Sequence, residues 1–332
     1  MERWSLRETD MLNRMPGPDS CLISVVIPVR NRESLIVPCI NSVAQQTYPP
    51  QEIIVVDDCS TDGTWRKLER AALDFPSVRP VRLSENLGAQ HARNVGVKAA
   101  HFPWIAFNDS DDIWMKDKLE IQIEELQRQK ADPMIVIHSD MYRQDGEDGQ
   151  LRYVPLPSFE EPGSFKKVLK GYGALFQTML VSKMALERVG FLDEDVPAYQ
   201  EWETTIRLGS VCRFVHISKP LFVWRRHGGE TISGNVLRGL SGYQYIIEKY
   251  GTDMIRQGGN RLYLRHLFLV AFQLFAAGNR DLSLSCLKKS EINAFSIKLS
   301  VFLMRHKMWC WLQKFLLRNF SRWQKLKMYL LG

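Results

Sequence analysis

Cysteine is scarce in this sequence, and no two cysteines have the Cys-x-x-Cys spacing. The six cysteines are scattered along 332 residues, at positions 21, 39, 59, 212, 286 and 310. A disulfide scaffold needs dense, paired cysteines and a cysteine zinc site needs closely spaced ones, so both classes are excluded. We expect reduced thiols, as in a cytosolic protein.

Long hydrophobic runs are also missing. Residues 1–20 carry charges throughout, without the apolar core of a secretory signal peptide, and are predicted to form a mobile N-terminal extension. The most apolar internal stretch, residues 262–277, is interrupted by Arg265 and His266. It is shorter than the roughly 20 apolar residues of a transmembrane helix, so it predicts a buried core helix instead.

Acidic residues are absent from residues 296–332. That segment carries eight basic residues, which are Lys298, Arg305, Lys307, Lys314, Arg318, Arg322, Lys325 and Lys327. The chain has a formal net charge of +7, and 7 − 8 leaves −1 for residues 1–295. A folded surface built for nucleic acid would itself carry the basic excess, so a nucleic-acid-binding body is disfavoured.

Strand and helix patterns alternate over the first half of the chain, whose composition is that of a folded protein of one or two domains. Runs rich in β-branched residues predict buried strands at residues 22–29, 52–56, 78–83 and 104–107. Helical patterns lie between them, at residues 35–46, 62–75 and 89–100. The alternation predicts an α/β fold with a mainly parallel sheet flanked by helices, and such sheets bind ligands beyond the carboxyl ends of their strands.

Acidic residues gather at two of those strand ends. Asp57 and Asp58 end the second strand, and Asp109, Asp111 and Asp112 follow the fourth. Three carboxylates within four residues repel one another unless a cation or solvent offsets their charge. Their natural partner is a hard divalent cation, Mg²⁺ or Mn²⁺, which usually retains positions for phosphate oxygens.

The residues that precede the next helix, Ser60, Thr61 and Asp62, allow two interpretations. Side chains of these types often cap a helix that follows a strand. Alternatively, they belong to the same polar edge as the acidic clusters.

Four motifs occur along the first half of the chain: SVVIPVRNRE, EIIVVDDCSTDGT, ENLGAQHARNVGVKAA and IAFNDSDDIW, with KLE close behind the last. In this order they resemble the family 2 glycosyltransferases of the GT-A fold, as found in bacterial surface polysaccharide synthesis. The resemblance covers about residues 22–130 and continues more weakly to about residue 235. It implies an inverting transferase that uses a nucleotide-diphosphate sugar, usually a UDP-sugar.

The resemblance assigns the nucleotide pocket to the ends of the first two strands. Pro28, Val29, Arg30 and Asn31 would line the pocket. Asp58 would accept a hydrogen bond from the ring N–H of the base, usually uracil, because a carboxylate is an acceptor only.

The resemblance also assigns the metal site. Asp109 and Asp111 match the family's DxD element, in which Asp111 would bind the metal directly and Asp109 would contact the ribose, or the metal through water. Gly88, Arg93 and Asn94 match a segment that shapes the pocket wall. For Arg93, a structural ion pair is an equal alternative to a phosphate contact.

Two residues depart from the family's pattern without removing a metal ligand. Arg30 takes a position usually held by Tyr, and Asn108 replaces an aliphatic residue just before the acidic turn. Because Arg30 would alter the donor pocket, the identity of the donor base is less well determined than the motifs alone imply.

Transfer to an alcohol also requires a base for the acceptor hydroxyl. The GFLDE run at residues 190–194 and the YQEWETTIRL run at residues 199–208 resemble the family's G-x-x-D-E element and its later acidic pair. Gln200 stands where the first acid of that pair usually lies, and Glu201 takes the place of the catalytic Asp. Glu203 is the reserve candidate. The alternative for Glu201 is an exposed first-turn acid that complements the helix dipole.

The run Trp-Arg-Arg-His-Gly-Gly at residues 224–229 resembles the family's aromatic-Arg-x-His loop. His227 would ligate the metal or contact the diphosphate, and a structural histidine is the alternative. Arg225 and Arg226 would offset phosphate charge.

The second half ends in helical patterns. Leu, Phe and Ala at helical spacing over residues 242–290 predict core helices, and residues 296–332 predict a basic amphipathic helix. Its basic side and its tryptophans suit the anionic cytoplasmic leaflet of a membrane. Alternatively, its apolar side packs on the catalytic domain or on a second subunit.

The predicted organisation is an extension, a GT-A catalytic domain with a nucleotide half and an acceptor half, a helical subdomain and a basic tail. Their ranges are 1–20, 21–235 (halves 21–130 and 131–235), 236–295 and 296–332. The predicted function is Mn²⁺- or Mg²⁺-dependent sugar transfer to a hydroxyl of a glycan or lipid-linked acceptor, on the inner face of the cell membrane.

Three other functions are considered. Gln200 at an acidic position motivates an inactive, nucleotide-sugar-binding scaffold protein. A nucleotidyltransferase would normally show a Gly-rich, basic loop after the first strand, which residues 28–31 are not. The basic tail motivates a nucleic-acid binder.

Overall fold

A computed structural model describes residues 21–146, 149–160, 164–171, 173–226, 236–276, 278–279, 281–283 and 285. The chain divides into two compact units. Unit 1 consists of the described parts of Met1–Val154, Phe176–Leu192 and Ile217–Arg225. Unit 2 consists of the described parts of Pro155–Leu175, Asp193–His216 and Arg226–Gly332. The predicted extension and basic tail lie outside the described residues.

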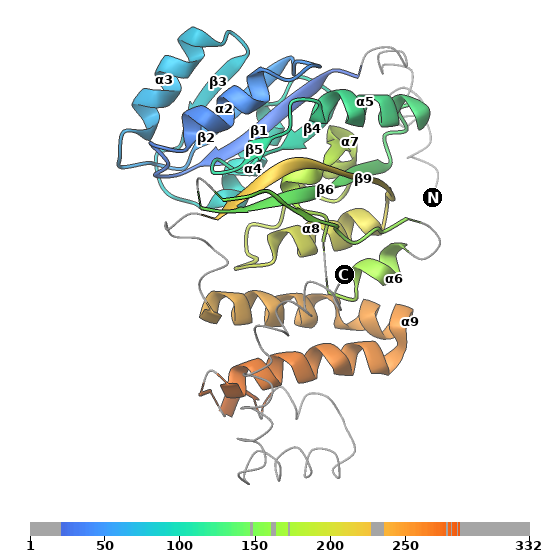
Figure 1. The fold of residues 1–332 in the computed structure, drawn as a ribbon. Coiled ribbons are helices and arrows are strands. Elements are labelled where there is room, and N and C mark those ends of the chain that lie inside the picture. Colours follow the sequence, from blue (N-terminus) through green and yellow to red (C-terminus); the bar gives the residue numbers. More distant parts are fainter. Residues whose placement is uncertain are drawn as a thin grey trace, which may run out of the picture. The chain divides into compact units, whose positions relative to one another are not determined.

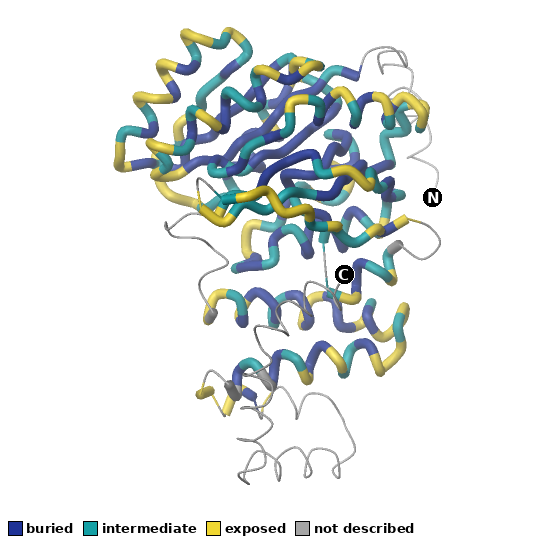
Figure 2. The backbone as a smooth tube through the Cα atoms, viewed as in Figure 1, coloured by how far each residue is buried: buried dark blue, intermediate teal, exposed yellow. Residues whose placement is uncertain are grey.

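Unit 1 begins with four parallel strands joined by helices (Figure 1). The strands are β1 (Ile23–Val29), β2 (Glu52–Asp57), β3 (Val78–Arg82) and β4 (Trp104–Phe107). The helices are α2 (Ile36–Ala44), α3 (Thr64–Asp74) and α4 (Ala89–Ala99). Every residue of β1, β2 and β4 is buried, as Figure 2 shows in dark blue, which explains why their sequences are continuous apolar runs. The predicted strands and helices are confirmed to within two residues.

The remaining strands extend the sheet beyond β4. They are β5 (Ile113–Trp114), β6 (Ile135–Asp145), β7 (Arg152–Val154), β8 (Leu180–Ser182) and β9 (Arg213–Arg226). The order is β3-β2-β1-β4-β8-β6-β9-β5, with β7 paired to β6. Because β8 is antiparallel to β4 and β6 is antiparallel to β8, the sheet is mixed, with its parallel part at β1–β4. Helices α5 (Lys118–Arg128) and α7 (Lys183–Arg188) and the 3₁₀ turn η1 (Phe176–Thr178) complete the unit.

The strand order places a topological switch point between β1 and β4. The chain runs outward from β1 through β2 to β3 and then returns to the other side of β1 as β4. With right-handed crossovers, α2 and α3 lie on one face of the sheet and α4 on the other. The carboxyl ends of β1 and β4 therefore lie next to each other, at the edge of the sheet where ligands bind in folds of this kind.

Unit 2 contains α6 (Ser164–Val168), α8 (Gln200–Gly209) and α9 (Val236–Ala276). Gly259, with φ 72° and ψ 173°, interrupts α9 and divides it into two helical stretches. The stretches lie side by side in Figure 1, and the Tyr243 hydroxyl is 2.8 Å from Nδ1 of His266 across them. The helix predicted over residues 242–290 is confirmed as far as Ala276. Among the described residues, no helix is long and apolar enough to cross a membrane.

The reduced state expected for the cysteines stays a prediction. Cys21, Cys39, Cys59 and Cys212 are all free thiols. The other two cysteines lie outside the described residues.

Helix α4 lies unusually close to β1 at Gly96. A Cβ built on Gly96 would be 2.4 Å from Cγ1 of Val26, a completely buried residue of β1. The absence of a side chain at this position sets the distance between helix and sheet, and with it the position of the residues at the start of α4.

Gly96→Ala is expected to destabilise the protein by up to about 2 kcal/mol. Alanine gains about 1 kcal/mol of helix propensity over glycine, but overpacking a core costs about 1–3 kcal/mol and Val26 is β-branched and stiff. Thermal melting measures the difference. The control is Gly239→Ala in α9, where an added Cβ meets nothing within 4 Å. A melting temperature that Gly96→Ala leaves unchanged or raises contradicts this packing.

Candidate functional site

The acidic turn that follows β4 lies at the switch point. Carboxylate oxygens of Asp109, Asp111 and Asp112 lie within 4.8 Å of one another. Arg32, which follows β1, approaches this group, with Nε 3.5 Å from Oδ2 of Asp111. The predicted acidic cluster is thus formed, and the ends of β1 and β4 meet at it.

Protein donors hold the carboxylates of Asp109 and Asp112. Nε2 of Gln177, from η1, donates to Oδ2 of Asp109 at 2.6 Å and to Oδ2 of Asp112 at 2.8 Å. Arg93 donates to Oδ1 of Asp109 at 2.6 Å, and the backbone N–H of Arg225 donates to Oδ1 of Asp112 at 3.1 Å. Both oxygens of each carboxylate therefore accept a hydrogen bond.

The surroundings disfavour negative charge on this turn. Burial, followed by repulsion from Asp111 and Asp109, raises the pKa of Asp112 well above its usual value, and this residue is 1% exposed. Burial also raises the pKa of Asp109, against the attraction of Arg93. The Asp109 side chain is 26% exposed, so water weakens the effect there. A divalent cation would offset the charge that protein donors alone do not.

The geometry fits a cation whose ligands are carboxylate oxygens. Asp112 is the inner acid, whereas the side chains of Asp109 and Asp111 are 26% and 21% exposed. A Mg²⁺-like ion typically takes one or two carboxylates and fills its remaining positions with water and phosphate oxygens. Asp111, with Asp109 beside it, is the residue best placed to hold one.

Asp58 lies at the end of β2 and is 4% exposed. Its Oδ1 accepts from the backbone N–H of Leu87 at 2.8 Å, and its Oδ2 accepts from that of Gly88 at 2.9 Å. With the Asn86 amide assigned from its hydrogen-bonding pattern, its nitrogen lies 2.7 Å from Oδ2 of Asp58 and its oxygen 2.7 Å from Nη1 of Arg30. Asp58 therefore orders the loop before α4. Base recognition by Asp58 stays a prediction.

Gly88 begins α4 with φ 92°, a conformation that other residues rarely adopt. This conformation favours glycine at this position of the motif, and the Gly88 N–H donates to Asp58 there. The predicted pocket residues Arg30, Asp58 and Gly88 are thus connected, through Asn86.

The segment after β1 is tied to the segment after β2. Asn31, with φ 49°, donates its N–H to Oγ of Ser60 at 2.9 Å and accepts the N–H of Thr61 at 2.8 Å. Asp62 accepts the N–H of Thr64, in the first turn of α3, at 2.9 Å. The N-cap of α3 is Gly63, without a side-chain cap, so Asp62 supports the first turn from the residue before it. Ser60 and Thr61 instead bind Asn31, in the segment that follows β1.

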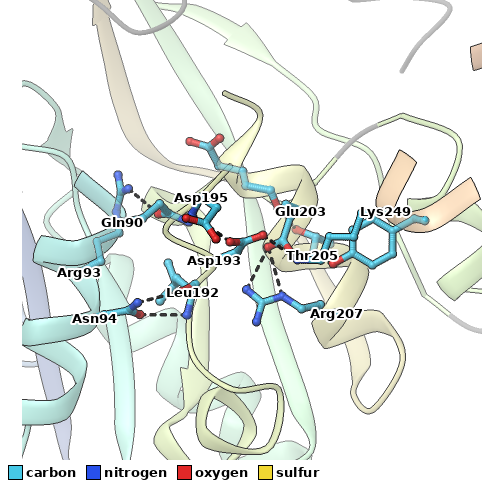
Figure 3. Close-up of polar contacts among 12 residues, drawn as sticks. Gln90, Arg93, Asn94, Leu192, Asp193, Asp195, Glu203, Thr205, Arg207 and Lys249 are labelled. Atoms are coloured by element: carbon cyan, nitrogen blue, oxygen red, sulfur yellow. Dashed lines mark hydrogen bonds and ion pairs between the residues drawn. The ribbon is translucent and has the colours of Figure 1, made fainter. Parts of the chain in front are cut away.

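Arg93 is buried and forms the ion pair that was one of its two predicted roles. Its guanidinium stacks on Phe176, 4.3 Å from the ring centroid, and also donates to Gln90 at 3.0 Å. Asn94 exchanges two hydrogen bonds with the backbone of Leu192, at 2.8 and 2.9 Å (Figure 3). Both residues tie the middle of α4 to other segments of unit 1, and a phosphate contact for Arg93 stays a prediction.

The candidate base lies in unit 2, in the first turn of α8. Glu201 is partly exposed and its backbone oxygen accepts the Thr205 hydroxyl at 2.6 Å. Glu203 is completely buried, and both of its oxygens are hydrogen-bonded to protein donors. Glu203 is thus a structural residue, which leaves Glu201 as the candidate base. His227 lies outside the described residues.

Gln177 was not predicted from the sequence. It lies in an uncharged stretch far from the acidic turn along the chain, and no motif marks it. Its anchor was missed as well: Gln122 donates to the backbone oxygen of Thr178 at 2.8 Å and accepts from Nζ of Lys118, which is completely buried. The only available signal was KLE, which places Lys118 in α5.

The sequence profile of Glycosyl transferase family 2 matches residues 24–190, half of the chain. The chain belongs to this family. The match contains all four motifs and the acidic turn, and it extends through Gln177.

Individual relatives support the assignment over shorter stretches. The chain is 45% identical to TuaG of Bacillus subtilis (strain 168) over 103 residues, 31% of this chain and 41% of TuaG. It is 43% identical to the UDP-Glc:alpha-D-GlcNAc-diphosphoundecaprenol beta-1,3-glucosyltransferase WfgD of Escherichia coli over 107 residues, 32% of this chain and 41% of WfgD. The chain thus spans about two fifths of the length of these relatives.

Solved structures confirm the fold. A crystal structure of residues 1–349 of S. aureus TarS in complex with UDP-GlcNAc matches with a TM-score of 0.59, over 77% of this chain and 73% of that one, at 21% identity. The α/β GT-A prediction is therefore confirmed, with a mixed sheet.

Lys118→Met is expected to change how stability depends on pH. Burial lowers the pKa of Lys118 from 10.5 to about 7, so between these values the unfolded chain binds a proton that the folded chain does not. The contribution of Lys118 to the free energy of unfolding therefore rises with pH between about 7 and 10.5, and it is constant below about pH 7. The melting temperature of the wild type should rise relative to that of the variant between pH 7 and about pH 10. A constant difference across that range contradicts the account of a neutral, buried amine.

Proposed function

We propose that the protein is a metal-dependent, inverting glycosyltransferase that moves a hexosyl group from a UDP-sugar to a hydroxyl of a glycan or lipid-linked acceptor. The observation that carries the proposal is the acidic turn at the switch point of a family 2 sheet. Its partly exposed acids, Asp109 and Asp111, lie where nucleotide ligands bind in such sheets.

Two kinds of observation support a UDP-sugar as the donor: the residues at the ends of β1 and β2, and the donors of related proteins. Asp58 binds residues 86–88, and Asn86 in turn binds Arg30 of the Pro28–Asn31 segment. This hydrogen-bonded group, at the ends of β1 and β2, would hold the nucleoside. WfgD is named for UDP-Glc, and TarS was crystallised with UDP-GlcNAc. A hexosyl donor with UDP is the simplest extension to this chain.

Asp111 and Asp109 would hold Mn²⁺ or Mg²⁺, and His227 is a further candidate ligand. When bound, the ion would neutralise the charge that develops on the leaving diphosphate. The residues around the turn contribute by position: Gln177 and Arg93 hold Asp109, and Arg32 adds positive charge beside Asp111.

Glu201 would act on the acceptor. As the acceptor oxygen bonds to the anomeric carbon, the bond from that carbon to the diphosphate breaks and the hydroxyl proton moves to the Glu201 carboxylate. A single base that acts opposite the leaving group is consistent with inversion.

Glu201→Gln is expected to lower kcat for transfer by about 10²–10⁴-fold, the usual contribution of a general base. UDP binding in Mn²⁺ should be unchanged, because the variant alters no donor-binding residue. The release of UDP from a UDP-sugar in the presence of acceptor measures kcat. Calorimetry measures the binding of UDP. Glu187→Gln, at an exposed acid of α7, is the control. Retained turnover in Glu201→Gln removes this residue from the mechanism, and a wild type that binds UDP-sugars without turnover supports the scaffold alternative.

We also propose that residues 296–332 attach the enzyme to an anionic membrane surface, where a lipid-linked acceptor would be located. The support is the sequence: eight basic residues, no acid and three tryptophans, Trp309, Trp311 and Trp323, in that segment. Basic amphipathic segments gain about 1 kcal/mol per basic residue near an anionic leaflet.

Charge reversal at Lys314, Arg318 and Arg322 to Glu is expected to abolish binding to vesicles that contain anionic lipid. Flotation of the full-length protein measures the bound fraction, which should also fall at high salt.

The matched control reverses three exposed basic residues of the body, Arg66, Lys67 and Lys130, and should float like the wild type. Equal flotation of the tail variant contradicts membrane attachment. Loss of self-association instead indicates that the tail packs on a second subunit.

A further inference from the structure

The first stretch of α9 lies against the segment that leads into α8. Positions 242, 245 and 249 of α9 share one helical face, since they are spaced three and four residues apart. A Cβ on Gly242 would be 2.5 Å from the backbone oxygen of Ala198, so helix and segment are in direct backbone contact. Tyr245 and Lys249 continue the same face toward Asp193.

Glu203 is the central anchor of this contact. Its Oε2 accepts from Nε and Nη2 of Arg207 at 3.1 and 2.9 Å, and its Oε1 accepts from Nζ of Lys249 at 2.8 Å and the hydroxyl of Tyr250 at 2.6 Å. Figure 3 shows Arg207 and Lys249 around this carboxylate. Four donors fill the hydrogen-bonding positions of a carboxylate. Removing the cation that pairs with a buried carboxylate strongly destabilises the folded protein.

Lys249 joins two segments through one ammonium group. It donates to Oδ2 of Asp193 at 2.6 Å as well as to Glu203, and Tyr245 donates to the same Asp193 oxygen at 2.7 Å. Burial opposes the charge on Lys249, but its hydrogen bonds to Asp193 and Glu203 prevail and raise its pKa. The ammonium is therefore fully charged at neutral pH and holds the loop at Asp193 and helix α8 together.

An aromatic cluster also packs around the start of α8, where this helix contacts α9. Tyr199 precedes the helix with φ 60°, and its ring packs on Trp202 and Tyr243 with centroids 6.3 and 5.4 Å away. His266, from the second stretch of α9, lies 2.9 Å from the backbone oxygen of Leu169, which can only accept, so its Nε2 carries the proton. Burial lowers the pKa of His266 to about 4, so the ring is neutral and Nδ1 accepts the Tyr243 hydroxyl.

These contacts bear on Glu201 through helix geometry. Glu201 and Glu203 are two residues apart, about 200° around α8, so they lie on opposite sides of the helix. Because Glu203 is anchored to α9, Glu201 lies on the side of α8 that faces away from α9. The same anchor fixes the position of Glu201 along the axis of α8.

We infer that α9 is a positioning element for the candidate base, with Lys249 as the positioning residue that sets the orientation of Glu201. The inference rests on the proposed function, because it assigns to Glu201 the role of base. It adds that activity depends on α9 as well as on α8, and both helices lie beyond residues 24–190, which the family profile matches.

The test compares Lys249→Met, Lys249→Arg and Tyr250→Phe in the full chain. Lys249→Met should lower kcat at least tenfold while KM for the UDP-sugar and the Kd for UDP with Mn²⁺ stay within twofold. Lys249→Arg should restore much of kcat, because it restores the cation between Asp193 and Glu203. Arg256→Met, at an exposed residue of the same helix, is the control and should match the wild type.

Tyr250→Phe guards against a folding failure of Lys249→Met, since it removes one hydrogen bond and leaves the ion pairs. It should lower kcat several-fold with KM unchanged. Wild-type kcat in folded Lys249→Met, or in Tyr250→Phe, overturns the inference, and so does a loss of donor affinity equal to the loss of kcat. If Glu201→Gln retains turnover, the proposed base is wrong whatever the Lys249 variants do. If Glu201→Gln is inactive and the Lys249 and Tyr250 variants are fully active, only the positioning role is wrong.

Discussion

The site depends on holding three carboxylates together at the end of β4. Asp109, Asp111 and Asp112 repel one another, and burial makes the repulsion worse. The protein counters it with donors from separate elements: Gln177 from η1, Arg93 from α4 and the backbone of Arg225 from β9. The antiparallel part of the sheet thus serves the acidic turn. It brings η1 and β9 to the end of a strand that is distant from both in sequence.

This arrangement gives the three acids different roles. Asp112 is the inner acid, held on both oxygens, and links the turn to β9. Asp109 is held on both oxygens yet partly exposed, and Asp111 faces Arg32. A divalent cation would offset the remaining unfavourable charge, and this links the structure of the turn to the proposed chemistry. In α8, Glu203 is buried with both oxygens hydrogen-bonded, whereas Glu201, the proposed base, is partly exposed.

The sequence predicted the parallel part of unit 1 well because its signals are local. Strands buried on both faces read as apolar runs, and the helices between them have clear periodicity. The antiparallel strands were not predicted, since β8 and β5 are short and their pairing depends on contacts distant in sequence. The acidic turn and Asp58 were found through their motifs, but their partners were not: Gln177 and Asn86 are uncharged amides whose importance arises only from folding. The role of Glu203 was also hidden, because Lys249 and Tyr250 lie more than forty residues away.

We propose that the acidic turn binds the donor through a divalent cation. Isothermal titration of UDP into the 332-residue chain, once with Mn²⁺ and once with EDTA, measures this dependence. We expect saturable binding with Mn²⁺ and an affinity at least about tenfold weaker in EDTA, a loss of about 1.4 kcal/mol or more. Equal affinity in the two conditions would contradict it.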